Sequence, residues 1–171
     1  MSRREEPLEG ELRRNPFFDG LSRRELKTLC GVLRPRSYEV GETIFDQGAP
    51  SVAAYAVLSG LVEIVQEDDG GAKTQLSEAG PGTLLGETAL LDDAPRTASA
   101  VVAEETMVAV FYRTELYRLA EERTGLAAKI VLQLSQVVAE RLRRTNRALK
   151  EVQEQLEAAQ GDTDQADGES P

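Results

Sequence analysis

Short apolar runs separated by turn-forming residues fill the chain between residues 37 and 111. The runs are rich in β-branched residues, and segments such as Gly48-Ala49-Pro50 and Gly80-Pro81-Gly82 separate them. Many short strands at this spacing are typical of an antiparallel sandwich or a small barrel. The sequence therefore predicts a mainly β fold, with Ser59-Gly60 and Ala103-Glu104-Glu105 among its turns. The predicted strands are residues 42–46, 53–58, 61–67, 72–76, 97–102 and 106–112.

Helical patterns flank the strands. Ser22-Arg23-Arg24-Glu25 has the spacing of a capping box and predicts a helix that runs to about Leu33. Pro35 follows and ends it. Residues 1–15 are charge-rich without an apolar period, so we expect a flexible N-terminal arm there. Within the strand region, residues 84–91 predict a single helical turn.

After residue 112 the pattern becomes helical again. Thr114 is expected to cap a short helix that ends at Glu122, and a long helix is predicted over residues 126–158. Residues 159–171 are acidic and lack an apolar anchor, which predicts a disordered tail. The expected organisation is therefore a β-barrel domain over residues 16–125, followed by the long helix and the tail.

Apolar residues in the long helix recur at alternating spacings of four and three, which is a heptad seam with one polar member. This seam predicts a homodimer through the helix, and a helix packed back on its own barrel fits the same pattern. Basic residues on the helix alternate with glutamates, which indicates a solvated flank rather than a nucleic-acid surface. The seam consists of Val138, Leu142, Thr145, Leu149, Val152 and Leu156.

The cysteine and histidine content limits the kinds of site that the chain can form. The single cysteine, Cys30, excludes an intramolecular disulfide, and its place in an apolar helical pattern predicts a packing role. The chain has no histidine, so it lacks the usual general base and the commonest transition-metal ligand. We therefore expect neither an enzyme nor a metal site, which also argues against a jelly-roll enzyme of the cupin kind. The absence of a secretory signal and of a spanning apolar run predicts a cytoplasmic protein.

The segment from Gly80 to Ser99 carries the most specific chemistry. Glycines before a short helical turn let the backbone approach a ligand and direct N–H groups at an anion. Arg96 is suited to a charge-assisted contact with that anion, and Thr97 to donating a hydroxyl. Glu87 repels phosphate but accepts hydrogen bonds from a sugar hydroxyl. Phosphate and ribose together indicate a nucleotide.

This segment resembles the phosphate-binding cassette of cyclic-nucleotide-binding domains, found in the catabolite activator protein, kinase regulatory subunits and cyclic-nucleotide-gated channels. The resemblance rests on Gly86-Glu87, Ala89-Leu90-Leu91 and Arg96-Thr97-Ala98, in that order. It extends upstream through residues 41–48 and 55–60. It implies a double-stranded β-helix (jelly-roll) barrel with an N-terminal helix and a long C-terminal helix.

The resemblance also implies individual roles. Glu87 would accept from the ribose 2′-hydroxyl, and Arg96 would pair with the cyclic phosphate. Thr97 and the backbone N–H groups near Gly86 and Thr88 would also bind the phosphate. The expected ligand is cAMP or cGMP, of which cAMP is preferred. Residues 134–146 resemble the dimer helix of the catabolite activator protein. The residues that would contact the base on that match are Thr145 and Asn146, while a register-setting role for Thr145 remains an equal alternative.

Two readings of function follow. The first is a sensor that binds a cyclic nucleotide and passes the signal through the long helix to a dimer or to an unknown effector protein. The second is a ligand-independent dimerisation or scaffold protein with a degenerate cassette. A DNA-binding regulator is not expected, because the net charge of −10 disfavours phosphate backbones and no helix-turn-helix pattern follows the long helix.

Overall fold

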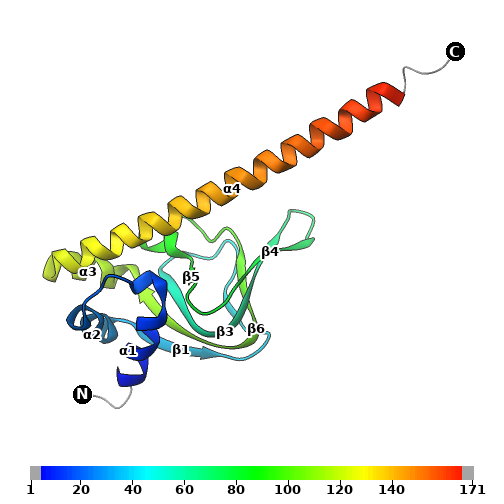
Figure 1. Cartoon of the computed structure of the whole chain (residues 1–171). Helices are drawn as coiled ribbons and strands as arrows, with labels where there is room; N and C mark the ends of the chain where they lie inside the picture. Colours follow the sequence, from blue (N-terminus) through cyan, green and yellow to red (C-terminus); the bar gives the residue numbers. More distant parts are fainter. Residues whose placement is uncertain (1–4, 167–171) are drawn as a thin grey trace. The chain divides into compact units, whose positions relative to one another are not determined.

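The computed structural model describes residues 5–166, with side chains described from residue 8 to residue 157. The chain divides into two units, Met1–Leu134 and Ser135–Pro171, and each is described by itself. In chain order the elements are α1 (Glu5–Arg14), η1 (Pro16–Phe18), α2 (Arg23–Val32), β1 (Arg34–Tyr38), β2 (Thr43–Phe45), β3 (Ala53–Glu67), β4 (Lys73–Ala79), β5 (Leu84–Leu85), η2 (Glu87–Leu90), β6 (Ser99–Tyr112), α3 (Arg113–Glu122) and α4 (Thr124–Ala166) (Figure 1).

The strands of the described residues form one antiparallel sheet built around β3 and β6. These two strands pair along most of their length, β6 also pairs with β1 and β2, and β3 also pairs with β4 and β5. Valines, alanines and a few larger side chains from all six strands form the core between them. Burial of each larger apolar side chain contributes about 1.5–3 kcal/mol. The expected mainly β fold with flanking helices is thus confirmed.

Two predicted turns are wrong, because β3 and β6 are long strands that continue through them. Ser59-Gly60 and Ala103-Glu104-Glu105 lie opposite each other, where the register between the strands shifts. Gly60 has φ +84°, and a Cβ there would lie 2.3 Å from the Glu105 carbonyl oxygen. The glycine therefore serves a bulge, which uses the same backbone conformation as a turn.

Strand β1 was not predicted, since Pro35 interrupts the pattern. It pairs with β6 and lies at one end of the strand order. Proline is tolerated in an edge strand because its missing N–H is not needed there. Helix α2 ends at Val32 and the strand starts at Arg34, so the helix ends before Pro35, as predicted.

Residues 5–14 of the expected flexible arm form helix α1, which corrects that prediction. Leu8 and Leu12 are buried, and α1 packs against α2. On its exposed side Arg13 pairs with Glu9 at 2.9 Å, one helical turn away. Two buried leucines four residues apart are thus enough to fix the helix, although the charges around them hide the period. Residues 1–4 lie outside the described residues.

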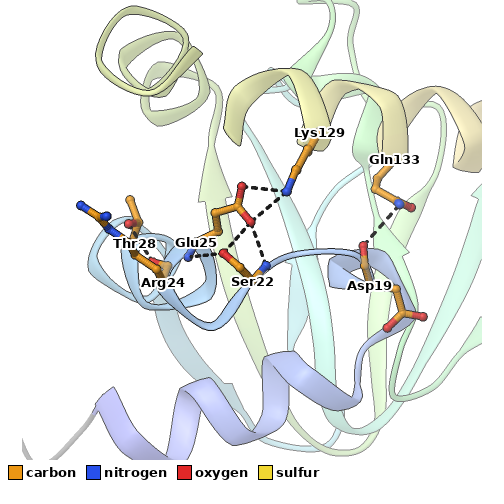
Figure 2. Close-up of polar contacts among 7 residues, drawn as sticks. All are labelled: Asp19, Ser22, Arg24, Glu25, Thr28, Lys129 and Gln133. Atoms are coloured by element: carbon orange, nitrogen blue, oxygen red, sulfur yellow. Dashed lines mark hydrogen bonds and ion pairs between the residues drawn. The ribbon is translucent and has the colours of Figure 1, made fainter. Parts of the chain in front are cut away.

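Helix α2 begins with the predicted capping box. The Ser22 hydroxyl accepts from the Glu25 N–H at 3.3 Å, and Glu25 accepts from the Ser22 N–H at 2.7 Å. Cys30 is buried in this helix, as expected. Figure 2 shows that the Glu25 carboxylate also faces Lys129 near the start of α4, with an N–O distance of 2.9 Å. One carboxylate therefore caps α2 and ties it to α4.

The C-terminal helices differ from their predicted limits. Thr114 lies inside α3, whose N-cap is Tyr112, so it does not cap that helix. Helix α4 begins at Thr124 and continues to Ala166. Residues 159–166 of the expected tail thus lie in the helix, while 167–171 lie outside the described residues. In the first unit α4 buries Leu126, Ala127, Ile130 and Leu134.

In the second unit most of the apolar seam is exposed. Leu142, Leu149, Val152 and Leu156 each have more than half of their surface accessible. The neighbouring basic residues pair within the helix, as in the contact between Arg143 and Glu140 at 2.9 Å, which fits the predicted solvated flank. No helix among residues 5–166 is sufficiently long and apolar to cross a bilayer.

The Glu25 contacts predict a pH dependence of stability. Hydrogen bonds from Lys129 and then from Ser22 lower the pKa of Glu25 from 4.5 to about 2. A lowered pKa stabilises the fold above the ordinary value and loses that contribution as the pH falls toward 2. Glu25→Gln is expected to cost roughly 1 kcal/mol of unfolding free energy at pH 7, and the difference should shrink between pH 4.5 and 2. Urea unfolding across this range measures it, with Glu11→Gln in α1 as the control. A difference independent of pH would contradict the assignment.

Candidate functional site

The antiparallel pairing of β5 with β3 fixes the segment that follows β5. Leu84 and Leu85 pair with Ala56 and Tyr55 of β3, so the chain emerges beside that strand. Gly86 then takes a left-handed conformation with φ +60° and ψ +35° and caps η2. The predicted helical turn in this region is confirmed. Ala89 N–H makes the first bond within the turn, to Gly86 O at 3.1 Å, so the Thr88 N–H takes no part in the turn.

Arg96 is held at both its backbone and its side chain. The Gly48 N–H donates to Arg96 O at 2.8 Å, and the Arg96 N–H donates to Ala49 O at 3.0 Å. The side chain enters the protein, where Nη2 donates to Ala53 O at 2.6 Å and Nη1 to Gly86 O at 3.3 Å. Only 6% of the residue is exposed. These contacts bring three loops and strands together around one guanidinium.

Two aromatic rings face the same guanidinium. The Arg96 Cζ atom lies 4.2 Å from the centroid of the Phe45 ring and 5.7 Å from that of the Tyr55 ring. The two rings lie 5.6 Å apart, with their planes inclined by 35°. Neither residue was predicted as part of the site, although both lie in the upstream segments of the resemblance. A single aromatic residue in a predicted strand indicates a core residue. Only the three-dimensional fold places these two rings beside the Arg96 guanidinium.

The charges of the site influence one another. Burial lowers the pKa of Arg96, while Tyr55 and then Glu87 oppose this by favouring the charged form. Burial raises the pKa of Tyr55, and the positive charge of Arg96 opposes that change. Glu87 is itself fully buried. Arginine keeps its proton even in such surroundings, so the site retains a buried positive charge beside a carboxylate.

One polar atom of the site lacks a protein partner. Arg96 Nε is buried and has no hydrogen-bond acceptor among the described residues. A buried donor without an acceptor costs free energy, so its presence in a native structure needs an explanation, such as a functional role or a bound ion. A guanidinium uses its fork of donors on planar or tetrahedral anions such as carboxylate and phosphate. The arrangement fits an anion that accepts from Nε.

Of the eight predicted site residues, the structure places Gly86 and Glu87 next to Arg96. Gly86, Glu87 and Arg96 form the buried part described above. Thr88 and Thr97 have exposed side chains on the same segment, and Ala98 is buried directly before β6. The remaining two, Thr145 and Asn146, are exposed in the second unit. Their role toward a base therefore stays a prediction. The described residues contain no cluster of acidic or cysteine side chains suited to a metal ion.

Comparison with known proteins identifies the class. Residues 35–123, just over half of the chain, match the family model of the cyclic nucleotide-binding domain. The chain belongs to this family.

Relatives and solved structures agree with this assignment. The chain is 36% identical over 129 residues to the cyclic AMP receptor protein of Thermus thermophilus, covering 75% of this chain and 58% of that protein. It is 31% identical over 141 residues to the CRP-like cAMP-activated global transcriptional regulator of Mycobacterium tuberculosis, with coverages of 82% and 61%. The crystal structure of the Thermus thermophilus catabolite activator protein matches with a TM-score of 0.72 and 34% identity, covering 81% of this chain and 63% of that one. The chain thus spans about three-fifths of the length of these curated relatives.

Gly86 is the position where a single methyl group would disturb this arrangement most. A Cβ there would lie 2.0 Å from Arg96 Nη1, and the backbone has a left-handed φ. Gly86→Ala is expected to destabilise the protein by about 1–3 kcal/mol, because it combines backbone strain with a steric clash. Urea unfolding measures the change. Gly31→Ala is the control, since nothing lies within 4 Å of a Cβ at Gly31. Equal effects of the two changes would contradict the close packing at Gly86.

Proposed function

We propose that this protein is a sensor that binds cAMP or cGMP in the segment from Gly86 to Ala98. The observation that carries the proposal is the buried Arg96 guanidinium, whose Nε lacks an acceptor among the described residues. The cyclic nucleotide-binding family of the chain supports the same ligand class. The names of the relatives, which refer to cAMP, favour the adenine nucleotide.

The cyclic phosphate is the group that Arg96 would bind. A phosphodiester carries one negative charge, which pairs with the guanidinium and accepts hydrogen bonds from it. The exposed Thr97 hydroxyl and the Thr88 N–H, on the same segment as Arg96, would supply further donors. Because the Arg96 side chain is buried, its contact with the phosphate would be stronger than one at an open surface. Phosphate recognition is therefore the main source of affinity.

Glu87 would select the sugar. A carboxylate accepts hydrogen bonds, and a ribose 2′-hydroxyl is a suitable donor. Arg96 lies close enough to Glu87 for the carboxylate charge to favour the protonated guanidinium. The pair then presents one positive and one negative group, which matches the anionic phosphate and the neutral hydroxyl of one nucleotide.

The signal would leave the site through α4. In this proposal Thr145 and Asn146 contact the base, and the ligand favours the conformation in which these contacts form. A ligand shifts an equilibrium only by its difference in affinity for the two states. The exposed seam of Leu142, Leu149, Val152 and Leu156 would then join two copies of the chain or an effector.

The same exposed seam supports the second candidate, a scaffold that dimerises without a ligand. An apolar stripe along a helix is stabilised by a partner helix whether or not a nucleotide is bound. In that case Arg96 would serve the packing of the barrel alone.

Calorimetric titration with cAMP and with cGMP distinguishes the two candidates. We expect saturable binding that Arg96→Ala weakens by at least roughly 30-fold, because the phosphate loses its buried cationic partner. Arg36→Ala is the matched control: Arg36 also lies over an aromatic ring, with Cζ 5.0 Å from the Tyr38 centroid, but on β1. The absence of binding heat and of thermal stabilisation with either nucleotide would favour the scaffold.

A further inference from the structure

The two rings that face Arg96 come from different strands. Phe45 ends β2 and Tyr55 lies near the start of β3, and both are partly buried against the core. Their faces lie 4.2 and 5.7 Å from the Arg96 Cζ atom. We refer to Phe45 and Tyr55 as the aromatic platform. The platform therefore lies against the buried guanidinium of Arg96.

The hydrogen bonds of Arg96 leave one of its donor atoms without an acceptor among the described residues. Nη1 and Nη2 donate to two backbone carbonyls, and Nε has no acceptor among the described residues. A guanidinium that has lost most of its water is attracted to the faces of aromatic rings, and this attraction increases when the pair is desolvated. The platform therefore contributes to holding the charge inside the protein before any anion arrives.

The platform also limits the orientation of the guanidinium. The group is planar, so two ring faces together with the Ala53 and Gly86 carbonyls leave few positions for its plane. A lysine ammonium has neither the plane nor the fork of donors and would not be held in this way. An arginine that is already oriented loses less side-chain entropy when it binds an anion.

We propose that Phe45 and Tyr55 are positioning residues that set the affinity of Arg96 for the phosphate of the ligand. This inference rests on the proposed function for its ligand. The rings hold the guanidinium in the orientation in which Nε has no acceptor among the described residues, so they act through Arg96. The Phe45 ring lies closer to the charge than the Tyr55 ring does.

A double-mutant cycle with cAMP as the probe tests this role. In the protein with Arg96, Phe45→Leu is expected to weaken binding about 3- to 10-fold, because the apolar bulk remains but the ring face is lost. In the Arg96→Lys protein, the same change is expected to alter the remaining affinity by less than about 2-fold. An equal loss in both backgrounds would overturn the proposal, since it would mean that Phe45 acts on the fold alone.

Two further variants test whether the effect belongs to the aromatic platform. Tyr55→Leu should show the same dependence on Arg96, and it replaces Phe45→Leu if that protein does not fold. Tyr38→Leu removes the ring beneath Arg36 and is expected to leave the affinity for cAMP unchanged. A loss as large as that of Phe45→Leu would overturn the assignment to the platform.

Failure of the proposed function is recognisable separately. If the unaltered protein binds neither cAMP nor cGMP, the same four proteins of the cycle are compared by urea unfolding without a ligand. If the rings stabilise the guanidinium, Phe45→Leu is expected to lower the unfolding midpoint more when Arg96 is present than when Lys replaces it. Additive shifts would show that the rings and the guanidinium are not coupled, which overturns the inference independently of any nucleotide.

Discussion

The site depends on keeping the positive charge of Arg96 inside a β protein. Removing a guanidinium from water is costly unless its donors and its charge find partners. Here the Ala53 and Gly86 carbonyls, two aromatic faces and the negative charge of Glu87 offset that cost. These partners come from β2, β3 and the turn after β5. One side chain thus contacts three parts of the chain at once. Its Nε atom still has no acceptor among the described residues.

Glycine conformations make this arrangement possible. Gly86 lets the chain turn in a left-handed conformation so close to Arg96 that no side chain fits between them. Gly48, with φ +77°, forms the neighbouring turn and donates its N–H to Arg96 O. The pairing of β5 with β3 places Leu85 opposite Tyr55, and the Arg96 side chain joins the next residue, Gly86, to Ala53 by donating to both carbonyls. The residues of the proposed anion site therefore also hold neighbouring parts of the sheet together.

Several features of the fold and of the candidate site were predictable from the sequence, because short local patterns determine them. The capping box at Ser22, the helical turn after Gly86 and the ordered residues of the cassette each occupy one short segment. The errors arose where long-range pairing decides the structure. Gly60 is locally indistinguishable from a turn residue, yet the facing strand makes it a bulge. Helix α1 depends on burying Leu8 and Leu12 against a helix whose position the sequence does not state, and Phe45 meets Arg96 only through the sheet.

The most direct test of the central claim is the side-chain NMR signal of the Arg96 Nε–H group, assigned by its disappearance in Arg96→Lys. The account predicts that saturating cAMP moves this signal downfield and slows its exchange with water, because the phosphate supplies the acceptor that the described residues do not. A ligand that binds with measurable heat while the Nε–H signal keeps its position and exchange rate would contradict the account.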